Sequence, residues 1–514
     1  MLELKNVSIR LALNDRVLVE DFSFNLHRGD KAVIIGEEGN GKSTLLRLIY
    51  GEEHVSGYCQ FSGQVARKGR LGYLPQAFPE GDLDICLEAY FADVELHRHA
   101  HVLARLGLSL DFAMSRQVIR TLSGGEKIKI QLAKIMIAEP DIILLDEPTN
   151  DIDIAALEWL EGFINSCDQP ILFISHDETL IENTANVIIH IEQLVRKTKS
   201  KIVVTYSGYK GYVKARGIAF DKQMQVARKQ RSEHKAQMEK WKQIHDRVEH
   251  DLGAISRQDP STGRLLKKKM KAVKSTGRRL ESQADEFLDI PQVEEAILTQ
   301  FNPATAVPQG KMVLALSMNE LRVGEGDFTA NDMALGRLLT GPITLDVYGP
   351  RRVGIIGRNG AGKSTLLKKI WECLRERKDI TAVYMPQDYA EVLDYNQPVI
   401  EFLAADAHKD TITKVRTFLG SMKFTHDEML GTIGKLSGGQ KAKVLFLDMV
   451  LKGANVLVLD EPTRNFSPLS APEIRKTLIN FGGTIISVSH DRKYLEEVCD
   501  TVYELSRDGI VARK

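Results

Sequence analysis

The chain holds 514 residues, more than one domain usually contains, and 43% of them are hydrophobic while 27% are charged. This composition is typical of folded globular proteins and excludes fibrous and disordered classes. Lys plus Arg and Asp plus Glu number 69 each, so the net charge of zero favours no class of partner. No apolar run approaches the ~18 residues of a membrane helix, the first residues lack the pattern of a signal peptide, and the five scattered cysteines favour neither a disulfide framework nor a zinc site. We therefore expect a cytoplasmic protein of several domains.

Four short motifs occur twice in the chain, in the same order. They are G-x-x-x-x-G-K-S at 36–43 and 357–364, Leu-Ser-Gly-Gly-Glu/Gln at 122–126 and 436–440, Asp-Glu-Pro-Thr at 146–149 and 460–463, and Ser-His-Asp at 175–177 and 489–491. The two copies of each of the last three motifs lie 314 residues apart. This regular displacement predicts that one cassette has been duplicated.

Each copy is predicted to fold as an α/β unit around a parallel sheet. Short apolar runs without alternation are typical of strands buried on both faces. The predicted strands are 32–35, 142–145 and 171–174 in the first copy and 353–356, 456–459 and 484–488 in the second. The predicted fold class is thus α/β, with two P-loop cassettes at 1–212 and 296–514 joined by a long basic α-helical hairpin linker at 213–295.

The G-x-x-x-x-G-K-S loops are predicted to bind the phosphates of a nucleotide. Their glycines let backbone N–H groups wrap the phosphates, and the helix that follows points its positive end at them. Lys42 and Lys363 would reach the β- and γ-phosphates, while Ser43 and Ser364 would bind Mg²⁺. One such short motif could match by chance, but two matches, each followed by the same later motifs, argue against chance.

Two adjacent acids end a predicted buried strand in each copy. A carboxylate there needs a charged partner, and Mg²⁺ would supply it to Asp146 and Asp460. Glu147 and Glu461 come next and are placed to orient or deprotonate an attacking water. The plainer alternative for these two glutamates is an acid at the start of a helix.

A histidine follows another predicted strand in each copy. A lone histidine in such a place is usually a core residue with its hydrogen bonds satisfied. Because His176 and His490 both occur in Ser-His-Asp at the same offset, we favour a sensor of the γ-phosphate for both.

The Leu-Ser-Gly-Gly motif is the most specific signal, because it places a serine cap and bare glycine N–H groups at the start of a helix. Its own cassette does not need this second phosphate-binding helix end, which makes sense if it closes on nucleotide held by the other cassette. With these motifs the chain resembles the ATP-binding-cassette (ABC) ATPases everywhere outside the central segment.

The resemblance implies two cassettes packed head to tail around two ATP molecules. Site one would then consist of Gly36, Gly39, Gly41, Lys42, Ser43, Thr44, Gln76, Asp146, Glu147 and His176, with Ser437, Gly438 and Gly439 of the second cassette. Site two would consist of Gly357, Gly360, Gly362, Lys363, Ser364, Thr365, Gln387, Asp460, Glu461 and His490, with Ser123, Gly124 and Gly125 of the first. The implied Mg²⁺ ligands are Ser43, Gln76 and Asp146 in site one and Ser364, Gln387 and Asp460 in site two, where the two glutamines match the family's Q-loops.

The chain departs from the family's pattern in two places. The first cassette offers Leu13 in the region where the family usually stacks an aromatic ring on adenine, which predicts loose base selectivity. After the second Asp-Glu-Pro-Thr motif, 463–470 differs from the usual D-loop, whereas 149–153 is close to it. We therefore expect the two sites to differ in hydrolysis rate or in coupling.

The segment between the cassettes is strongly basic. Residues 214–280 hold nineteen Lys and Arg against seven Asp and Glu, a net charge of +12. Helices are predicted at 214–250 and from 265 to about 287, with a turn at 253–263 and a hairpin tip near 251–266. Such an excess is typical of a segment that binds phosphate backbone, and RNA is favoured over duplex DNA because no groove-reading motif is present. The residues predicted to face RNA are Lys267, Lys268, Lys269, Lys271, Lys274, Arg278 and Arg279. A solvated spacer between the cassettes is the alternative.

Two intact cassettes joined by a long charged linker resemble the ABC-F family of translation factors. The interval between the Q-loop and the Leu-Ser-Gly-Gly motif is short in the first cassette, and 461–470 is similar to the antibiotic-resistance members. That resemblance implies a monomer, with its cassettes paired within the chain, that binds the ribosomal E site and moves its linker toward the P-site tRNA and the 23S rRNA of the peptidyl-transferase centre. Neither a membrane nor DNA is expected as a partner. A housekeeping ABC-F factor and the nucleotide-binding subunit of a transporter remain as alternatives.

Overall fold

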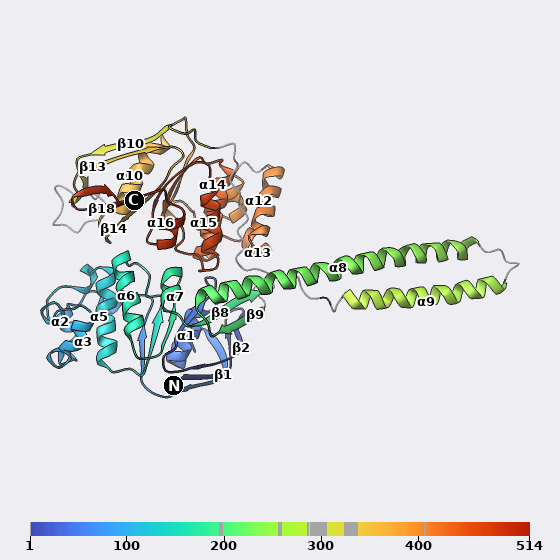
Figure 1. Cartoon of the computed structure of the whole chain (residues 1–514), viewed down its shortest axis with the longest axis horizontal. Helices are drawn as coiled ribbons and strands as arrows, with labels where there is room; N and C mark the ends of the chain where they lie inside the picture. Colours follow the sequence, from blue (N-terminus) through green and yellow to red (C-terminus); the bar gives the residue numbers. More distant parts are fainter. Residues whose placement is uncertain are drawn as a thin grey trace. The chain divides into compact units, whose positions relative to one another are not determined.

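The computed structural model describes residues 2–194, 199–254, 260–284, 287, 306–322, 338–405 and 408–513 (Figure 1). The chain divides into a compact unit of Met1–Tyr209 with Glu294–Lys514 and a second unit, Lys210–Val293. The predicted boundary at 295–296 lies outside the described residues. Within the described parts of the chain, no helix is both long enough and apolar enough to span a membrane.

Each cassette is built on a six-stranded sheet, and the two sheets share one topology. In the first cassette the order is β5 (Leu71–Leu74), β6 (Ile142–Asp146), β7 (Ile171–Ile174), β3 (Lys31–Ile35), β8 (Val187–Leu194) and β9 (Lys199–Thr205). In the second it is β15 (Ala382–Met385), β16 (Val456–Asp460), β17 (Thr484–Val488), β14 (Arg352–Gly357), β18 (Thr501–Ser506) and β19 (Gly509–Ala512). The first five strands of each sheet run parallel and the last is antiparallel. The predicted α/β class and parallel sheets are confirmed.

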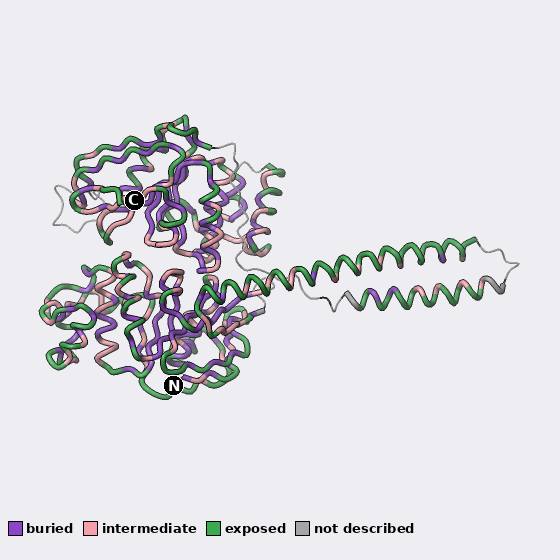
Figure 2. The backbone as a smooth tube through the Cα atoms, in the orientation of Figure 1, coloured by how far each residue is buried: buried purple, intermediate pink, exposed green. Residues whose placement is uncertain are grey.

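The central strands are fully buried, as their unbroken apolar sequences require (Figure 2). The larger helices of the first cassette are α1 (Lys42–Tyr50), α5 (Gly124–Ile137), α6 (Ile154–Ser166) and α7 (Glu178–Thr184). Their counterparts in the second are α10 (Lys363–Arg375), α14 (Gly438–Leu451), α15 (Ala471–Ile479) and α16 (Arg492–Glu497). Because β3, β6 and β7 are parallel, the motifs that follow them meet at one edge of the sheet.

An antiparallel layer completes each cassette. In the first it contains β2 (Val17–Leu26), β1 (Leu2–Leu11) and β4 (Cys59–Arg67), and in the second β10 (Met312–Met318) with β13 (Ile343–Tyr348) and β11 (Leu321–Arg322) with β12 (Leu338–Thr340). Further helices lie between the Q-loop and the Leu-Ser-Gly-Gly motif of each cassette. They are α2 (Leu87–Tyr90), α3 (Ala100–Arg105) and α4 (Leu110–Ala113), and α11 (Val399–Leu403), α12 (Lys409–Ser421) and α13 (His426–Leu430).

The linker is an antiparallel pair of helices, α8 (Tyr209–Ala254) and α9 (Pro260–Ala284), which lie side by side in Figure 1. Both helices extend further toward the tip than predicted. Gly253 and Gly263, for which the sequence predicts a turn, lie in helices instead. A proline is tolerated in the first turn of a helix, so Pro260 begins α9 rather than preventing it. The remainder of the predicted turn, 255–259, lies outside the described residues.

The two linker helices pack through residues spaced three and four apart, the pattern of a coiled coil. In α8 this stripe includes His234, Met238, Trp241, His245 and Val248, and in α9 it includes Leu266, Met270, Val273, Gly277 and Leu280. The indole N–H of Trp241 donates to the carbonyl oxygen of Val273 at 2.8 Å. The ring also covers Gly277, where a Cβ would lie 2.7 Å from it. The small residue is therefore required by the packing of Trp241.

Candidate functional site

The two P-loops have the same backbone conformation. Gly41 and Gly362, which precede α1 and α10, have φ angles of 90° and 92°, in the left-handed region that favours glycine. The Nζ atom of Lys42 donates to the carbonyl oxygens of Gly36 and Glu37, at 2.8 and 3.0 Å. Each loop thus presents backbone N–H groups at the start of a helix, which is a phosphate-binding geometry.

The lysine of the second loop has the same surroundings. The Nζ atom of Lys363 lies 2.9 Å from the carbonyl oxygen of Gly357 and 3.1 Å from that of Arg358. Its burial lowers the pKa of its ammonium group. A phosphate would replace these carbonyl oxygens as the partner of either lysine.

The aspartates that end β6 and β16 are buried. Asp146 accepts hydrogen bonds from the hydroxyls of Ser43, at 2.8 Å, and Tyr73, at 3.1 Å. Both carboxylate oxygens of Asp460 are buried and accept no hydrogen bond from the part of the chain that is described. Burial raises the pKa of both carboxyl groups. Buried acceptors of this kind beside a serine hydroxyl fit a hard divalent cation such as Mg²⁺.

The next residue in each cassette, Glu147 or Glu461, is held in the left-handed region at φ 49° or 51°. Such strain at a non-glycine residue is typical of functional sites. Glu147 accepts hydrogen bonds from the side-chain amides of Gln76 and Asn150, both at 2.8 Å. Glu461 accepts from the backbone N–H of His490 at 3.2 Å.

These two glutamates differ in electrostatic environment. Burial alone would raise the pKa of Glu147, but the hydrogen bond and charge of His176 and the charge of Lys42 outweigh it and lower that pKa to about 2. Burial and the neighbouring Asp460 raise the pKa of Glu461 to about 8. The charge around this glutamate therefore differs between the two cassettes.

The two histidines also differ in their contacts. Nε2 of His176 lies 3.4 Å from Oε1 of Glu147, and Nδ1 lies 3.0 Å from the carbonyl oxygen of Phe466 in the second cassette. Nε2 of His490 lies 3.8 Å from Glu461, whereas its buried Nδ1 has no hydrogen-bond partner among the described residues. Burial and the charge of Lys363 lower the pKa of His490 to about 4.

Each Leu-Ser-Gly-Gly motif opens a helix through a capping box. Ser123 caps α5 with Glu126, and Ser437 caps α14 with Gln440. Ser437 lines a cavity with Glu38 and Gly39 of the first P-loop. In the same way Ser123 and Gly124 line a cavity with Asn359 and Gly360 of the second P-loop. The structure therefore brings each motif beside the P-loop of the opposite cassette. Gly125 differs, because a Cβ at that position would meet Ala156 of its own cassette.

Two further cavities are lined by most of the other predicted residues, but Gly36, Asp146, Gly357, Gly438 and Gly439 line neither. A cavity of about 370 Å³ is lined by Gly39, Gly41, Lys42, Ser43, Thr44, Gln76, Glu147 and His176, together with Arg464 and Asn465. A cavity of about 590 Å³ is lined by Gly360, Gly362, Lys363, Ser364, Thr365, Gln387, Asp460, Glu461 and His490, together with Asn150 and Asp151.

Leu13 does not line the first cavity. Its side chain is 97% exposed in the turn between β1 and β2. Leu11 and Leu18, from the strands on either side of that turn, line the first cavity instead.

Several residues at the sites have no place in the sequence motifs. Arg464 donates to the carboxylate of Asp151 at 2.8 Å, so the two D-loops touch. Asn359 donates to the carbonyl oxygen of Asp151 at 2.6 Å. Glu37 and Glu38 of the first P-loop also reach the second cassette. The sequence gives one sign that Glu37 and Glu38 have a special role: the second P-loop has Arg358 and Asn359 at the same two positions.

A cluster of ion pairs joins the cassettes beside the two histidines. The acids come from the first cassette and the bases from the second. The pairs are Arg475–Glu178 at 2.8 Å, Arg492–Glu161 at 2.9 Å, Arg492–Asp177 at 3.3 Å, Lys493–Glu178 at 2.7 Å and Lys493–Glu182. Near the second D-loop, the hydroxyl of Tyr209 donates to the carbonyl oxygen of Pro468 at 2.8 Å in a buried contact.

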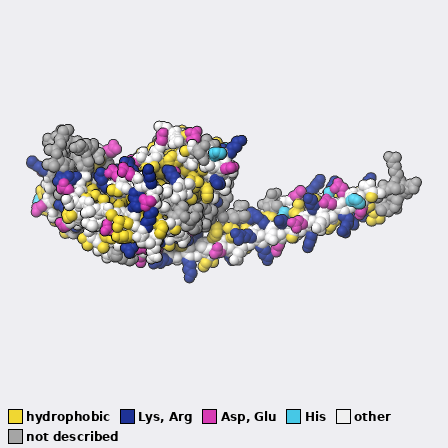
Figure 3. Space-filling view, turned by 90° about the horizontal axis from the view of Figure 1, so that it is seen from above, with side chains coloured by type: hydrophobic (Ala, Val, Ile, Leu, Met, Phe, Trp, Pro, Cys, Tyr) yellow, Lys and Arg dark blue, Asp and Glu magenta, His cyan; other side chains and the backbone are white. Residues whose placement is uncertain are grey.

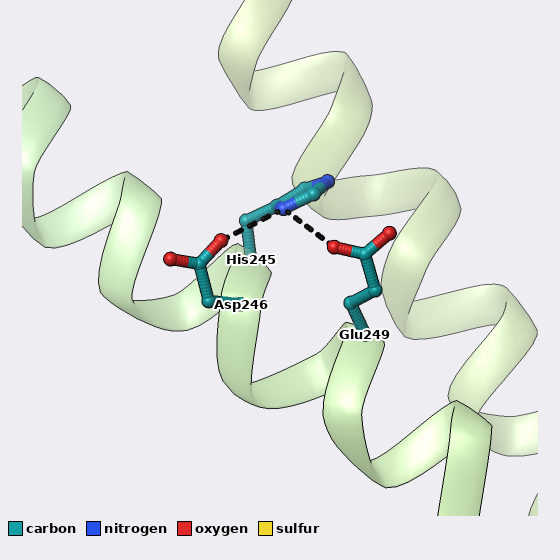
Figure 4. A group of neighbouring side chains, drawn as sticks. All are labelled: His245, Asp246 and Glu249. Carbon is teal, nitrogen blue, oxygen red and sulfur yellow. Dashed lines mark hydrogen bonds and ion pairs between the residues drawn. The ribbon is translucent and has the colours of Figure 1, made fainter.

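The linker presents a basic surface. All seven residues predicted to face RNA are exposed on α9, and Figure 3 shows Lys and Arg side chains along the hairpin. On α8, Nδ1 of His245 lies 3.4 Å from Asp246 and 3.7 Å from Glu249 (Figure 4). The His245 ring also lies beside Trp241, with 5.2 Å between ring centroids. These contacts orient a histidine at the seam of the hairpin.

The sequence matches the family described as ABC transporter over residues 19–150 and 340–464, half of the chain. It is 26% identical to ABC transporter F family member 2 of Arabidopsis thaliana, over 96% of this chain and 74% of that protein. It is 24% identical to ATP-binding protein Uup of Buchnera aphidicola, over 98% of this chain and 80% of that protein. Among solved structures, the complex of archaeal ribosomal stalk protein aP1 and archaeal ribosome recycling factor aABCE1 shares the fold, with a TM-score of 0.58, 15% identity and coverage of 99% of this chain and 90% of that chain.

Proposed function

The chain belongs to the ABC transporter family, as a tandem-cassette ATPase of the ABC-F type, and on that basis we propose that it is an ATP-driven factor that acts on the ribosome in the cytoplasm. Residues 1–212 and 296–514 serve as the two ATPase cassettes and 213–295 as the effector segment. The chain works as a monomer, because each P-loop already meets the opposite Leu-Ser-Gly-Gly motif within one chain.

In the proposed reaction, Lys42 and Lys363 bind the β- and γ-phosphates of ATP. Mg²⁺ would be held by Ser43, Gln76 and Asp146 in site one and by Ser364, Gln387 and Asp460 in site two, where it would neutralise phosphate charge. Glu147, oriented by Gln76 and Asn150, takes the proton of the attacking water, and Glu461 does so in site two. His176 and His490 bind the γ-phosphate.

The observation that carries the ribosome proposal is the basic face of α9. Eight exposed Lys and Arg side chains, Arg264 and the seven predicted ones, lie on α9, and residues 214–280 carry a net charge of +12. This positive charge favours a partner with a phosphate-rich surface. The resemblance to ribosome-protecting ABC-F proteins narrows the partner to 23S rRNA and P-site tRNA, with the linker displacing an antibiotic from the peptidyl-transferase centre.

The test is co-sedimentation with ribosomes of the Glu147→Gln, Glu461→Gln double variant, with ATP and without, at two salt concentrations. We expect pelleting that needs ATP and weakens with salt, because phosphate contacts release counterions. The Lys42→Ala, Lys363→Ala double variant is the control and should stay in the supernatant. A protein that fractionates with membranes instead would support the transporter alternative.

Drug protection is tested separately from binding. Expression in a susceptible bacterium should raise the inhibitory concentration of peptidyl-transferase antibiotics, and Glu147→Gln, Glu461→Gln should abolish that increase. Ribosome binding with unchanged drug susceptibility would instead identify a housekeeping ABC-F factor.

A further inference from the structure

The two acids inside the first P-loop reach across to the second cassette. Oε2 of Glu38 accepts a hydrogen bond from the backbone N–H of Gly439 at 2.8 Å. Oε1 of Glu37 accepts one from the hydroxyl of Ser467 at 2.8 Å and another from Ser470. Both serines are buried, whereas Glu38 is exposed.

The N–H group that Glu38 binds lies in the first turn of α14. The N–H groups of a helix's first turn lack partners within the helix and favour a negative charge. The hydroxyl of Ser437 is engaged with the N–H of Gln440, at 3.3 Å, and so does not serve Gly439. The Glu38 carboxylate therefore holds a donor that suits a phosphate oxygen.

The second P-loop has a neutral residue at the same position. Asn359 stands four residues before Lys363, as Glu38 stands four residues before Lys42. Its side-chain amide donates to the carbonyl oxygen of Asp151 and brings no negative charge to the opposite helix. The two P-loops therefore differ in charge at this position.

We propose that Glu37 and Glu38 form an acidic clamp that holds the first composite site closed in the absence of nucleotide, so that ATP binds there only by displacing Glu38 from Gly439. The inference rests on the proposed pairing of the first P-loop with Ser437–Gly439. The triphosphate and the carboxylate compete for one donor and repel each other, so ATP binds the first site more weakly than the second.

The experiment isolates site one with Lys363→Ala and measures the dissociation constant of a fluorescent ATP analogue on the full chain without ribosomes. Glu38→Asn, which copies the second P-loop, and Glu38→Gln, which keeps the shape of the side chain, should each lower the constant by about tenfold, from the removal of one like charge. The matched control is Asn359→Glu in a Lys42→Ala background, which should weaken binding at site two by a similar factor.

An unchanged or higher dissociation constant in both Glu38 variants would overturn the clamp. A Lys42→Ala, Lys363→Ala chain that still binds the analogue would overturn the site assignment itself. Neither outcome touches ribosome binding, which the pelleting assay measures independently, so a failure of the clamp is distinguishable from a failure of the proposed function.

Discussion

The imidazole of His176 connects the first cassette's Glu147 to the main-chain carbonyl oxygen of Phe466 in the second cassette. Both ring nitrogens of His176 therefore lie beside an oxygen atom, one in each cassette. His490 has no matching contact with the first cassette's D-loop among the described residues. Among the described residues, only the first cassette's histidine therefore has a hydrogen bond to the opposite cassette.

His176→Ala should lower the free energy of unfolding by about 1 kcal/mol more than His490→Ala does, because only His176→Ala removes a hydrogen bond between the cassettes. The measurement is denaturant unfolding of both variants in parallel. In a Glu461→Gln background, His176→Ala should also slow ATP hydrolysis at site one by about 100-fold or more. Equal destabilisation by the two variants would contradict the one-sided contact.

Arg475→Ala should be strongly destabilising. This side chain is 3% exposed between Glu178 and Glu497, and removing one partner of a buried ion pair costs about 3–5 kcal/mol. Arg464→Ala is the control: its pair with Asp151 also joins the cassettes but is exposed, so about 1 kcal/mol or less is expected. Thermal unfolding of both variants gives the comparison, and similar melting temperatures would refute it.

Gly277→Val should disrupt the hairpin, because the new side chain would enter the space of the Trp241 ring. Overpacking of this kind costs about 1–3 kcal/mol. Gly263→Ala, also in α9, meets no atom within 4 Å and should stabilise the helix by about 0.5–1 kcal/mol. Hydrogen–deuterium exchange of α9 amides should rise in the first variant and fall in the second. No change in the first would show that Trp241 is free to move away.

Reversing four charges on α9, by Lys267→Glu, Lys268→Glu, Lys269→Glu and Lys271→Glu together, should abolish ribosome pelleting and flatten its salt dependence. Each lost phosphate contact reduces the slope of log affinity against log salt by about 0.7–0.9.

The matched control reverses the same number of exposed lysines on α8, at Lys222, Lys229, Lys235 and Lys240. It changes the net charge equally and should cost less binding if α9 carries the contact surface. Wild-type binding by the α9 variant would remove this surface from the mechanism.

The sequence correctly predicted the site residues that lie at the carboxyl ends of strands. The strands 171–174 and 484–488 are as predicted, and Asp146 and Asp460 end their strands as expected. Because parallel strands place their carboxyl ends together, the gathering of motifs at one edge of each sheet follows from the pattern alone.

What the sequence did not predict depends on partners that are distant along the chain. The opposite shifts in the pKa values of Glu147 and Glu461 arise from the surroundings that folding creates, and identical motifs conceal them. The bonds from Glu37 to serines more than 400 positions away could not be read from spacing. Toward the tip, both linker helices extend past their predicted ends, and Gly253 and Gly263 lie in helices although glycine is a poor helix former.

The helix α8 runs without interruption for 46 residues from Tyr209, whose hydroxyl is bonded to the carbonyl oxygen of Pro468. Pro468 follows Ser467, the residue that Glu37 contacts. A rod of this length, about 70 Å, turns a rotation of about 5° at Tyr209 into a displacement of about 6 Å at Ala254. If the linker acts as proposed, its stroke would be set by its length, so removing whole turns from both arms should shorten the stroke and leave the chemistry of the nucleotide sites unchanged.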